Sequence, residues 1–516
     1  MIATIESATI CGISCIPVRV EVDAAKGLPC FEMVGYLGSE VREARERVRV
    51  ALKNIGIELP PVRITVNLAP AHVHKGGTAF DLPIAVGVLA ALEYLPKEQV
   101  EGILMVGEIG LNGEIRPVRG ILPIVQQAAK RGIAHCIIPK ANEREGAVIQ
   151  SVKVTGVEDL QQVFEYLLQT PKKRDKMIAP AKVELADVFA EEKMEEMPDF
   201  ADITGQEGAK RGVEVAAAGF HNVLMIGPPG AGKTMIAKRI PGILPPLDLK
   251  ESLEVSTIYS VSGLLKENET LITKRPFQSP HHTISESALI GGGRVPRPGV
   301  VSLAHHAVLF LDEFGEFKRK TLDILRQPLE EKQVHIARTY GKYTYPADFM
   351  LVAAMNPCPC GYFPDRKRCR CTEAEINRYL AKISGPILDR IDICVEAAPV
   401  KIQQLNAAHR SEKSADIRAR VMQAQERQKK RFEGTGYRFN SQMSGTDIAR
   451  FCPLGEKEER LLTSAFKTMG LSARGYHRVL KVARTIADLE NSDKLLESHL
   501  AEAICYRGMD GKYWQS

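Results

Sequence analysis

Hydrophobic residues recur with two different periods along the chain, and their order predicts how it is divided. In the N-terminal part, short apolar runs typical of strands are mixed with longer runs that have helical spacing. The predicted strands are Val18–Val22, Ile64–Leu68, Ile103–Gly107 and Cys136–Pro139, and the predicted helices are Glu40–Ile55, Asp81–Leu92 and Pro123–Arg131. The Asn-Gly pair within Leu111–Glu114 predicts a hairpin turn. We therefore expect an α+β domain over residues 1–170.

The pattern changes in residues 171–198, where apolar periodicity is weak and opposite charges are segregated. Pro171–Lys176 is basic, whereas Glu191–Glu196 is acidic. Both features are typical of a linker or a mobile tether between domains.

From residue 199 to residue 396, predicted strands and helices follow one another, and we expect an α/β domain over this range. The predicted strands are His221–Ile226, Val308–Leu311 and Phe349–Ala354, and the predicted helices are Phe200–Ala218 and Lys318–Glu331. Two alternating runs, Val334–Arg338 and Tyr343–Tyr345, predict a β-hairpin with Gly341 and Lys342 at its tip.

Residues 397–516 have a mainly helical pattern, and we expect them to form a helical lid. The predicted helices are Ile417–Phe432, Gly445–Arg450, Glu456–Met469, Gly475–Leu489 and Asp493–Tyr506. Residues 401–438 also contain ten Lys/Arg against four Asp/Glu, a surplus equal to the net charge of +6 of the whole chain. A solvated helix face and a surface that binds a polyanion both explain this surplus.

Composition narrows the class of protein. The 516 residues are 44% hydrophobic and 26% charged, which is ordinary for a globular protein of about three domains. No apolar run is long enough to span a membrane, and the first residues lack the basic start and apolar core of a signal peptide. Eleven cysteines, an odd number in a large chain, favour a reducing compartment over a disulfide framework. We expect a cytoplasmic protein.

A glycine-rich loop between a predicted strand and a predicted helix carries the strongest chemical signal. Its residues are Gly227, Pro228, Pro229, Gly230, Ala231, Gly232, Lys233 and Thr234, which match the phosphate-loop pattern. Backbone N–H groups of such a loop surround phosphates, and the N-terminus of the following helix favours the anion. Lys233 is expected to reach the β- and γ-phosphates of ATP, and Thr234 to coordinate Mg²⁺.

An acidic pair at the end of a second strand agrees with this assignment. Asp312 and Glu313 directly follow the apolar run Val308–Leu311. A carboxylate at the end of a buried strand beside a phosphate loop can provide the second protein contact to Mg²⁺, which is the role expected of Asp312. Glu313 is the candidate for polarising the attacking water. The sequence therefore predicts binding and hydrolysis of ATP.

Four cysteines lie in two close pairs, Cys358/Cys360 and Cys369/Cys371, on either side of a basic loop. Four thiolates can complete a tetrahedral Zn²⁺ site, although single-residue spacing is less diagnostic than two-residue spacing. Reduced free thiols and a redox switch are the alternatives. We expect a structural zinc within an insertion over residues 358–371.

The long segment between the phosphate loop and Asp312 contains Ser279–Thr283 and the glycine- and arginine-rich Gly291–Gly299. Long loops inside compact domains are usually functional. Arg294 and Arg297, together with Lys342 of the predicted hairpin, are candidates for contacting the phosphates of a threaded polyanion. A surface loop ordered by its prolines is the alternative.

The N-terminal part resembles the proteolytic domain of Lon-type proteases. The resemblance is carried by Lys75–Leu82, Val106–Val118, Ala128–Ile133 and Ile138–Asn142. That family cleaves peptides with a Ser–Lys dyad, in which the lysine deprotonates the serine. The resemblance places Thr78 at the serine position and Leu122 at the lysine position, and a leucine cannot act as a base. We therefore expect a scaffold without protease activity.

The remaining motifs resemble AAA+ ATPases, in the branch of magnesium-chelatase subunits and replicative MCM helicases. The motifs are Asn356–Gly361, which follows the hairpin, Leu388–Asp392, and Ser472–Arg478 near the C-terminus. Together with the Lon-like front half, they identify the chain as similar to the ComM/YifB magnesium chelatase-like family. That resemblance covers almost the whole chain. It implies a ring-forming, ATP-driven DNA motor, expected to be hexameric, that migrates branched recombination intermediates during uptake of foreign DNA.

The resemblance also implies roles for three further residues. Asn356 corresponds to the sensor that orients the attacking water, and Arg474 to a second sensor in the lid. Arg390 corresponds to an arginine finger for a neighbouring subunit, with Arg378 in reserve; the alternative for Arg390 is an ion pair with Asp389 or Asp392. Two other functions fit the same nucleotide site, an ATPase driving metal insertion into a porphyrin and a scaffold that ATP merely switches.

Overall fold

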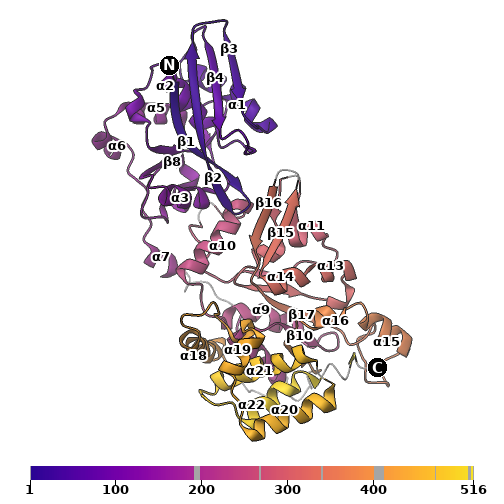
Figure 1. Ribbon diagram of the computed structural model, residues 1–516. Helices are drawn as coiled ribbons and strands as arrows, with labels where there is room; N and C mark the ends of the chain where they lie inside the picture. Colours follow the sequence, from indigo (N-terminus) through magenta and orange to yellow (C-terminus); the bar gives the residue numbers. More distant parts are fainter. Residues whose placement is uncertain are drawn as a thin grey trace.

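The computed structural model of the protein describes residues 2–190, 198–266, 269–293, 295–338, 341–399, 412–470, 472–508 and 513–514. These residues form three units, with the N-terminal unit at one end of the molecule and the C-terminal helices at the other (Figure 1). The predicted fold class is confirmed, because an α+β unit is followed by a parallel-sheet α/β domain and a helical region. No helix among the described residues is long and apolar enough to cross a membrane.

The N-terminal unit is built on a mixed sheet of seven strands, in the order β3-β4-β2-β1-β5-β8-β9. The strands are β1 (Ile2–Cys11), β2 (Ser14–Ala25), β3 (Cys30–Val34), β4 (Arg63–Ala69), β5 (Ile103–Met105), β8 (His135–Pro139) and β9 (Lys153–Val157). A small hairpin of β6 (Glu108–Ile109) and β7 (Ile115–Arg116) surrounds the predicted Asn-Gly turn. The helices are α1 (Ser39–Asn54), α2 (Asp81–Ala91), α3 (Ile121–Lys130), α4 (Glu143–Ala147) and α5 (Leu160–Leu168). All strands and helices predicted for this unit are confirmed within a few residues, whereas β1, β3 and β9 were not predicted.

Helix α2 forms the centre of this unit and is buried along its whole length. It approaches the sheet so closely that a Cβ on Gly87 would lie 2.7 Å from Cγ2 of Val22. Its first residue, Asp81, accepts hydrogen bonds from Arg47 Nε at 2.7 Å and Nη2 at 2.9 Å. This two-point contact attaches α1 to the start of α2.

The first half of the predicted linker differs from the expectation of a tether. Helix α6 (Pro171–Met177) packs against the N-terminal unit, because the buried Arg174 donates to the backbone oxygens of Leu167 and Gln99, both at 2.9 Å. A second short helix, α7 (Leu185–Ala190), follows. This packing depends on one buried arginine that donates to backbone carbonyls. It produces no periodic pattern of apolar residues, so the sequence pattern could not reveal it.

The central unit contains a parallel five-stranded sheet in the order β11-β14-β17-β10-β18. Its strands are β10 (Val223–Ile226), β11 (Phe277–Gln278), β14 (Val308–Leu311), β17 (Met350–Met355) and β18 (Ile393–Glu396). The surrounding helices are α8 (Glu207–Gly219), α9 (Lys233–Ile243), α10 (Leu249–Ser262), α11 (Glu286–Ile290), α12 (Val300–Leu303), α13 (Arg319–Ile324), α14 (Arg326–Glu331), α15 (Glu373–Leu380) and α16 (Gly385–Leu388). The helix predicted over Lys318–Glu331 is divided at Leu325, because Pro328 has no N–H to donate to the carbonyl four residues earlier.

Two β-hairpins project from this unit. The first joins β12 (Gly291–Gly292) to β13 (Arg297–Pro298), and the second joins β15 (Gln333–Arg338) to β16 (Gly341–Pro346). The second hairpin was predicted, but Gly341 and Lys342 belong to β16 and pair with Arg338 and Ala337 rather than forming the tip.

The C-terminal helices are α18 (Ser414–Arg431), α19 (Gly445–Phe451), α20 (Glu456–Met469), α21 (Ala473–Leu489) and α22 (Glu497–Cys505), which confirms the predicted helical region. They share one hydrophobic core with the central unit, in which Val213 and Ala217 of α8 belong with Val421 and Ile486. The C-terminal helices are therefore packed directly on the helix that precedes the phosphate loop.

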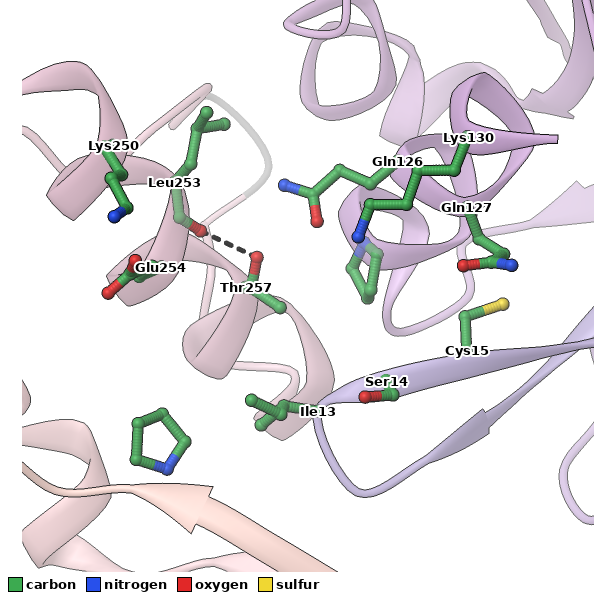
Figure 2. A pocket seen from close by; sticks show the side chains of 12 residues that line it. Ile13, Ser14, Cys15, Gln126, Gln127, Lys130, Lys250, Leu253, Glu254 and Thr257 are labelled. Atoms are coloured by element: carbon green, nitrogen blue, oxygen red, sulfur yellow. Dashed lines mark hydrogen bonds between the residues drawn. The ribbon is translucent and has the colours of Figure 1, made fainter. Parts of the chain in front are cut away.

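The N-terminal unit contacts the central unit mainly through α3 and α10. Glu145 lies at this junction and accepts hydrogen bonds from the backbone N–H of Leu122 at 2.9 Å and from Ser260 Oγ at 2.5 Å. Leu122 is itself buried in a small apolar cluster with Val148 and Leu271. Beside these contacts lies a cleft of about 430 Å³, with α3 side chains such as Lys130 on one side and α10 on the other (Figure 2).

The junction can be tested by truncating Leu122. We expect Leu122→Ala to lower the free energy of unfolding of the N-terminal unit by about 2–4 kcal/mol, because the substitution leaves a cavity in an apolar cluster. Differential scanning calorimetry of the full chain measures this change. Leu111→Ala is the matched control, since Leu111 is 56% exposed and its truncation should alter stability by no more than about 0.5 kcal/mol. Equal effects of the two substitutions would contradict a packed junction.

Candidate functional site

Three adjacent strands end at the same edge of the central sheet and assemble the predicted site. Strand β17 lies between β10 and β14, with Ile226 opposite Met355 and Leu311 opposite Ala353. The phosphate loop, Asn356 and Asp312 follow these strands directly. Ligands of open parallel sheets bind beyond this carboxyl edge of the strands. The fold therefore brings the three predicted segments together.

Lys233 lies against the phosphate loop that precedes it. Its Nζ donates to the carbonyl oxygens of Gly227 at 2.6 Å and Pro228 at 3.0 Å, and to Oδ1 of Asn356 at 3.2 Å. Burial lowers the pKa of Lys233 to about 8, while the negative charge of Asp312 acts in the opposite direction. Gly230 and Gly232 have φ angles of +76° and +84°, which lets the loop turn its N–H groups inward.

Thr234 and Asp312 meet as expected for a magnesium site. The Thr234 hydroxyl donates to Oδ2 of Asp312 at 2.7 Å. A hydroxyl and a carboxylate are hard oxygen ligands, and Mg²⁺ in nucleotide sites is held by one or two such groups together with phosphates. The two side chains therefore fit the ion, and they are the residues that would hold it.

Glu313 has an unusual backbone and an unpredicted partner. Its φ of +51° is rare for a residue with a side chain. Its carboxylate lies 3.0 Å from Nδ1 of His282. His282 follows β11, a strand of two residues that pairs with β14, so its position beside Glu313 depends on a strand too short to be recognised from sequence.

Arg390 is held by its own chain. It donates to a carboxylate oxygen of Glu330 and to the carbonyl of Pro386, and its side chain is 9% exposed. The predicted alternatives, ion pairs with Asp389 or Asp392, are wrong, because Asp389 pairs with Arg478 at 3.2 Å and Asp392 with His221 at 3.3 Å. The reserve candidate Arg378 is exposed on α15.

Arg474 lies in the first turn of α21, with Nη1 3.8 Å from Asp389 and a side chain that is 67% exposed. Arg478, one turn later, is buried and bonds the same aspartate. Both arginines therefore connect the C-terminal helices to the segment that carries Arg390. The ion-pair partner of Arg474 is Asp389, and its role as a sensor stays a prediction.

The DNA-contact candidates gather on the two hairpins. Arg297 on β13 and Lys342 on β16 are exposed, whereas Arg294 lies outside the described residues. The hairpins touch, because Tyr345 donates to the carbonyl of Pro296 at 2.8 Å. Arg338, which sequence reasoning missed, is also exposed and donates to the carbonyl of Gly293 at 3.3 Å. In the alternating run Arg338 falls on the same face as the buried Val334 and Ile336, so the pattern gave no signal for it.

The four predicted zinc ligands come together. The sulfur of Cys358 lies 3.4 Å from that of Cys360 and 3.7 Å from that of Cys369, and all four sulfurs lie within 4.8 Å of one another. The cysteines are not joined by disulfides. Their arrangement suits a tetrahedral metal.

A second cluster, Glu254 with His305 and His306, is explained without a metal. Nδ1 of His305 accepts a hydrogen bond from the backbone N–H of Asp348 at 3.0 Å, so its proton lies on Nε2, 3.3 Å from Glu254. A metal-binding imidazole instead donates through its second nitrogen. His306 Nε2 lies 2.8 Å from the same carboxylate, and the cluster is a hydrogen-bonded contact between α10 and the loop before β14.

The basic surplus predicted around residues 401–438 is partly neutralised within the chain; residues 400–411 lie outside the described ones. Arg420 pairs with Glu214 at 2.5 Å, Arg431 with Asp488, and Arg438 with Glu251 at 2.5 Å. These pairs connect the C-terminal unit to itself and to the central unit. For these three arginines the structure shows ion pairs within the chain, which neither of the two interpretations had predicted.

The two residues predicted at the positions of the Lon-type Ser–Lys dyad have different surroundings. Thr78 donates its hydroxyl to Glu108, and Leu122 is fully buried at the junction. The neighbour of Thr78 in these contacts is therefore a carboxylate, and position 122 offers no amine. Asp81, at the start of α2, is instead occupied by Arg47.

The lowered pKa of Lys233 predicts that nucleotide affinity depends on pH. Bound phosphates favour the charged amine, so the pKa of Lys233 rises when nucleotide binds. The affinity for MgADP is therefore highest below pH 8, and it falls as the pH rises through the unliganded pKa of about 8. We expect the affinity to fall about tenfold between pH 7 and pH 9, with proton uptake. Titration calorimetry in buffers of different ionisation enthalpy measures both. In Lys233→Arg, whose guanidinium stays charged, the dependence should vanish; if it persists, another group titrates.

Comparison with protein families covers most of the chain. The family described as "Magnesium chelatase, subunit ChlI" matches residues 199–405, "Subunit ChlI of Mg-chelatase" matches residues 20–142, and "Magnesium chelatase, subunit ChlI C-terminal" matches residues 411–507.

Individual proteins give the same result over almost the full length. YifB of Escherichia coli is 43% identical over 506 residues, which cover 97% of this chain and 96% of YifB. Competence protein ComM of Haemophilus influenzae is 40% identical over 513 residues, which cover 98% of both chains. An archaeal Lon protease of Thermococcus kodakarensis is 28% identical over 151 residues, or 28% of this chain and 24% of that protein, which supports a Lon-like N-terminal region. The chain therefore belongs to the ComM/YifB family of magnesium chelatase-like AAA+ proteins.

Proposed function

We propose that this protein is an ATP-hydrolysing motor that moves branched DNA, in the manner of a branch-migration helicase acting on recombination intermediates. The observation that carries the proposal is the pair of hairpins, which present Arg297, Arg338 and Lys342 on elements inserted between strands of the nucleotide-binding sheet. The relative named as a competence protein supports a link to natural transformation.

In the proposed reaction, Lys233 releases the carbonyls of Gly227 and Pro228 and binds the β- and γ-phosphates of ATP. Thr234 and Asp312 would hold Mg²⁺, which when bound neutralises charge on the phosphates. Glu313 orients and polarises the attacking water once its carboxylate leaves His282. Asn356, already in contact with Lys233, fixes the water relative to the γ-phosphate.

The motor is proposed to act as a ring, expected to be hexameric, in which Arg390 stabilises the transition state of the adjacent subunit. In the single chain Arg390 is bound to Glu330, so its use in the neighbouring site requires that this pair opens. Arg474 would report the nucleotide state from the C-terminal helices.

Two further parts of the proposal concern the rest of the chain. The four clustered cysteines are proposed to hold a structural Zn²⁺, because their sulfurs already have the spacing of a tetrahedral site. The N-terminal unit is proposed to be a scaffold without protease activity, because Leu122 offers no base and is buried at the junction.

A second candidate is an ATPase that drives metal insertion into a porphyrin. The descriptions of the matching families, which name magnesium chelatase, favour it. The two candidates differ in what stimulates ATP hydrolysis, since a chelatase subunit needs a separate porphyrin-binding protein and a motor needs DNA.

The hairpin surface predicts a salt-dependent contact with DNA. We expect a labelled four-way junction to stimulate ATP hydrolysis at low salt and to bind with an affinity that falls steeply with salt. Lys342→Ala or Arg297→Ala should each reduce the slope of log affinity against log salt by about one, because one phosphate contact is lost. Fluorescence anisotropy and phosphate release measure the two effects. Lys457→Ala, an exposed lysine on α20, is the control. Absence of stimulation in the native protein would overturn the motor, and unchanged slopes would overturn this surface.

The arginine finger predicts a difference between Arg390 and its partner. Arg390→Ala should lower the rate of ATP hydrolysis about a thousandfold or more while ADP affinity is unchanged, because the guanidinium acts in the adjacent site. Glu330→Gln breaks the same ion pair but keeps the guanidinium, so its rate should be native or higher. Mixing Arg390→Ala with Lys233→Ala should restore part of the activity, since mixed rings contain complete sites. Equal losses in Arg390→Ala and Glu330→Gln would show that the ion pair within the chain is what matters.

A further inference from the structure

The four clustered cysteines, which we call the cysteine knuckle (residues 358–371), have the dimensions of a metal site rather than of a thiol cluster. With a zinc–sulfur bond of about 2.3 Å, the sulfurs of a tetrahedral site lie about 3.8 Å apart. The measured separations among Cys358, Cys360 and Cys369 are 3.4, 3.6 and 3.7 Å, far longer than a disulfide bond. The backbone N–H of Phe363 also points at the sulfur of Cys358, at 3.4 Å, as a bond from the surroundings to a thiolate ligand does.

The cysteine knuckle lies directly against the phosphate loop. Gly361 has a φ of +84°, and a Cβ built on it would lie 2.5 Å from Cδ and 2.9 Å from Cγ of Pro229. Its backbone N–H is bonded to the carbonyl of Cys358 at 3.0 Å, so the turn that touches Pro229 is closed by a metal-ligand residue. Pro229 is the third residue of the phosphate loop, and a shift of this contact would displace the N–H groups that face a phosphate.

The same knuckle continues the strand that ends at the nucleotide site. Cys358 comes two residues after Asn356, whose Oδ1 accepts a hydrogen bond from Lys233. The other end of the knuckle leads into α15, where Thr372 caps the helix with a reciprocal bond to Glu375. The hydroxyl of Tyr379 on α15 lies close to the backbone of Asn356. The knuckle therefore touches the site from two sides, at Pro229 and at Asn356.

From this arrangement we propose that a divalent zinc ion bound by Cys358, Cys360, Cys369 and Cys371 sets the affinity of the phosphate loop for nucleotide through the contact of Gly361 with Pro229. The inference rests on the proposed zinc occupancy and nucleotide binding, and it is independent of DNA. Metal binding fixes the four sulfurs and with them the turn at Gly361. Loss of the metal releases that turn. The phosphate loop then loses more conformational entropy when it binds a phosphate, and its affinity falls.

The test uses the full chain, purified under reducing conditions without added metal. Metal content is measured by mass spectrometry, and affinity by fluorescence of a methylanthraniloyl derivative of ADP with Mg²⁺. We expect one zinc per chain in the native protein and none in Cys360→Ser/Cys371→Ser. We expect this zinc-free variant to bind the ADP derivative about five- to tenfold more weakly, in the range typical of coupled sites. Gly361→Ala should keep its zinc and show a loss of similar size, because its Cβ displaces Pro229.

Two matched controls separate the contact from general damage. Gly56→Ala has the same φ of +84° but no atom within 4 Å of the added Cβ, so it reports backbone strain alone. Cys505→Ser removes an exposed cysteine outside the cluster. Both should bind zinc and nucleotide as the native protein does.

Each outcome of this experiment decides one step. Native protein that contains no zinc and takes up none from Zn²⁺-containing buffer overturns the metal site. A zinc-free, folded variant with native affinity for the ADP derivative overturns the coupling, and so does native affinity in Gly361→Ala. Failure of the proposed DNA motor would leave all these measurements unchanged, because no DNA is present in them.

Discussion

The parallel register of three strands is the constraint on which the rest of the structure depends. Strand β17 is hydrogen-bonded on one side to β10 and on the other to β14, and all three are buried along their whole length. Because parallel strands point the same way, the segments that leave them start at one edge of the sheet. Lys233, Asp312 and Asn356 are therefore neighbours although they are far apart in sequence. The bond from Thr234 to Asp312 at 2.7 Å and the bond from Lys233 to Asn356 at 3.2 Å follow from the register.

The inserted elements connect to this edge of the sheet. Helix α10 follows α9 of the phosphate loop and contacts the other two units, through Ser260 to Glu145 on one side and through Glu251 to Arg438 on the other. In the sequence, the second hairpin comes between β14 and β17, and the cysteine knuckle comes between β17 and β18. The nucleotide site is thus connected through these elements to each of the candidate contact surfaces. Elements packed on such an edge can convert a small displacement there into a larger one.

The sequence was informative wherever the chemistry needs neighbouring residues. The phosphate loop, the acidic pair after β14 and the paired cysteines are each contained in a few consecutive positions, and the structure brings them together. Contacts between distant residues had no such signal. Arg390 binds Glu330, sixty positions away, and His282 meets Glu313 through a strand of two residues. The contact of Gly361 with Pro229 depends on the missing side chain of a glycine, and a pattern of hydrophobic residues does not record such a contact. Pro328, in contrast, was a local signal that divides a helix and could have been read.

The N-terminal unit shows how one position can serve only one of two purposes. Leu122 is the residue predicted to stand at the lysine position of Lon-type proteases, and its side chain is fully buried in an apolar cluster with Leu271 of the central unit. An ionised lysine at this position would lose its hydration between apolar side chains, at a cost of several kcal/mol per uncompensated charge. The carboxylate of Glu145, at the same junction, is already engaged by the backbone of Leu122 and by Ser260. In this arrangement of the two units, a charged base at position 122 and a closed junction exclude each other. The apolar side chain that closes the junction is therefore one that cannot serve as a base.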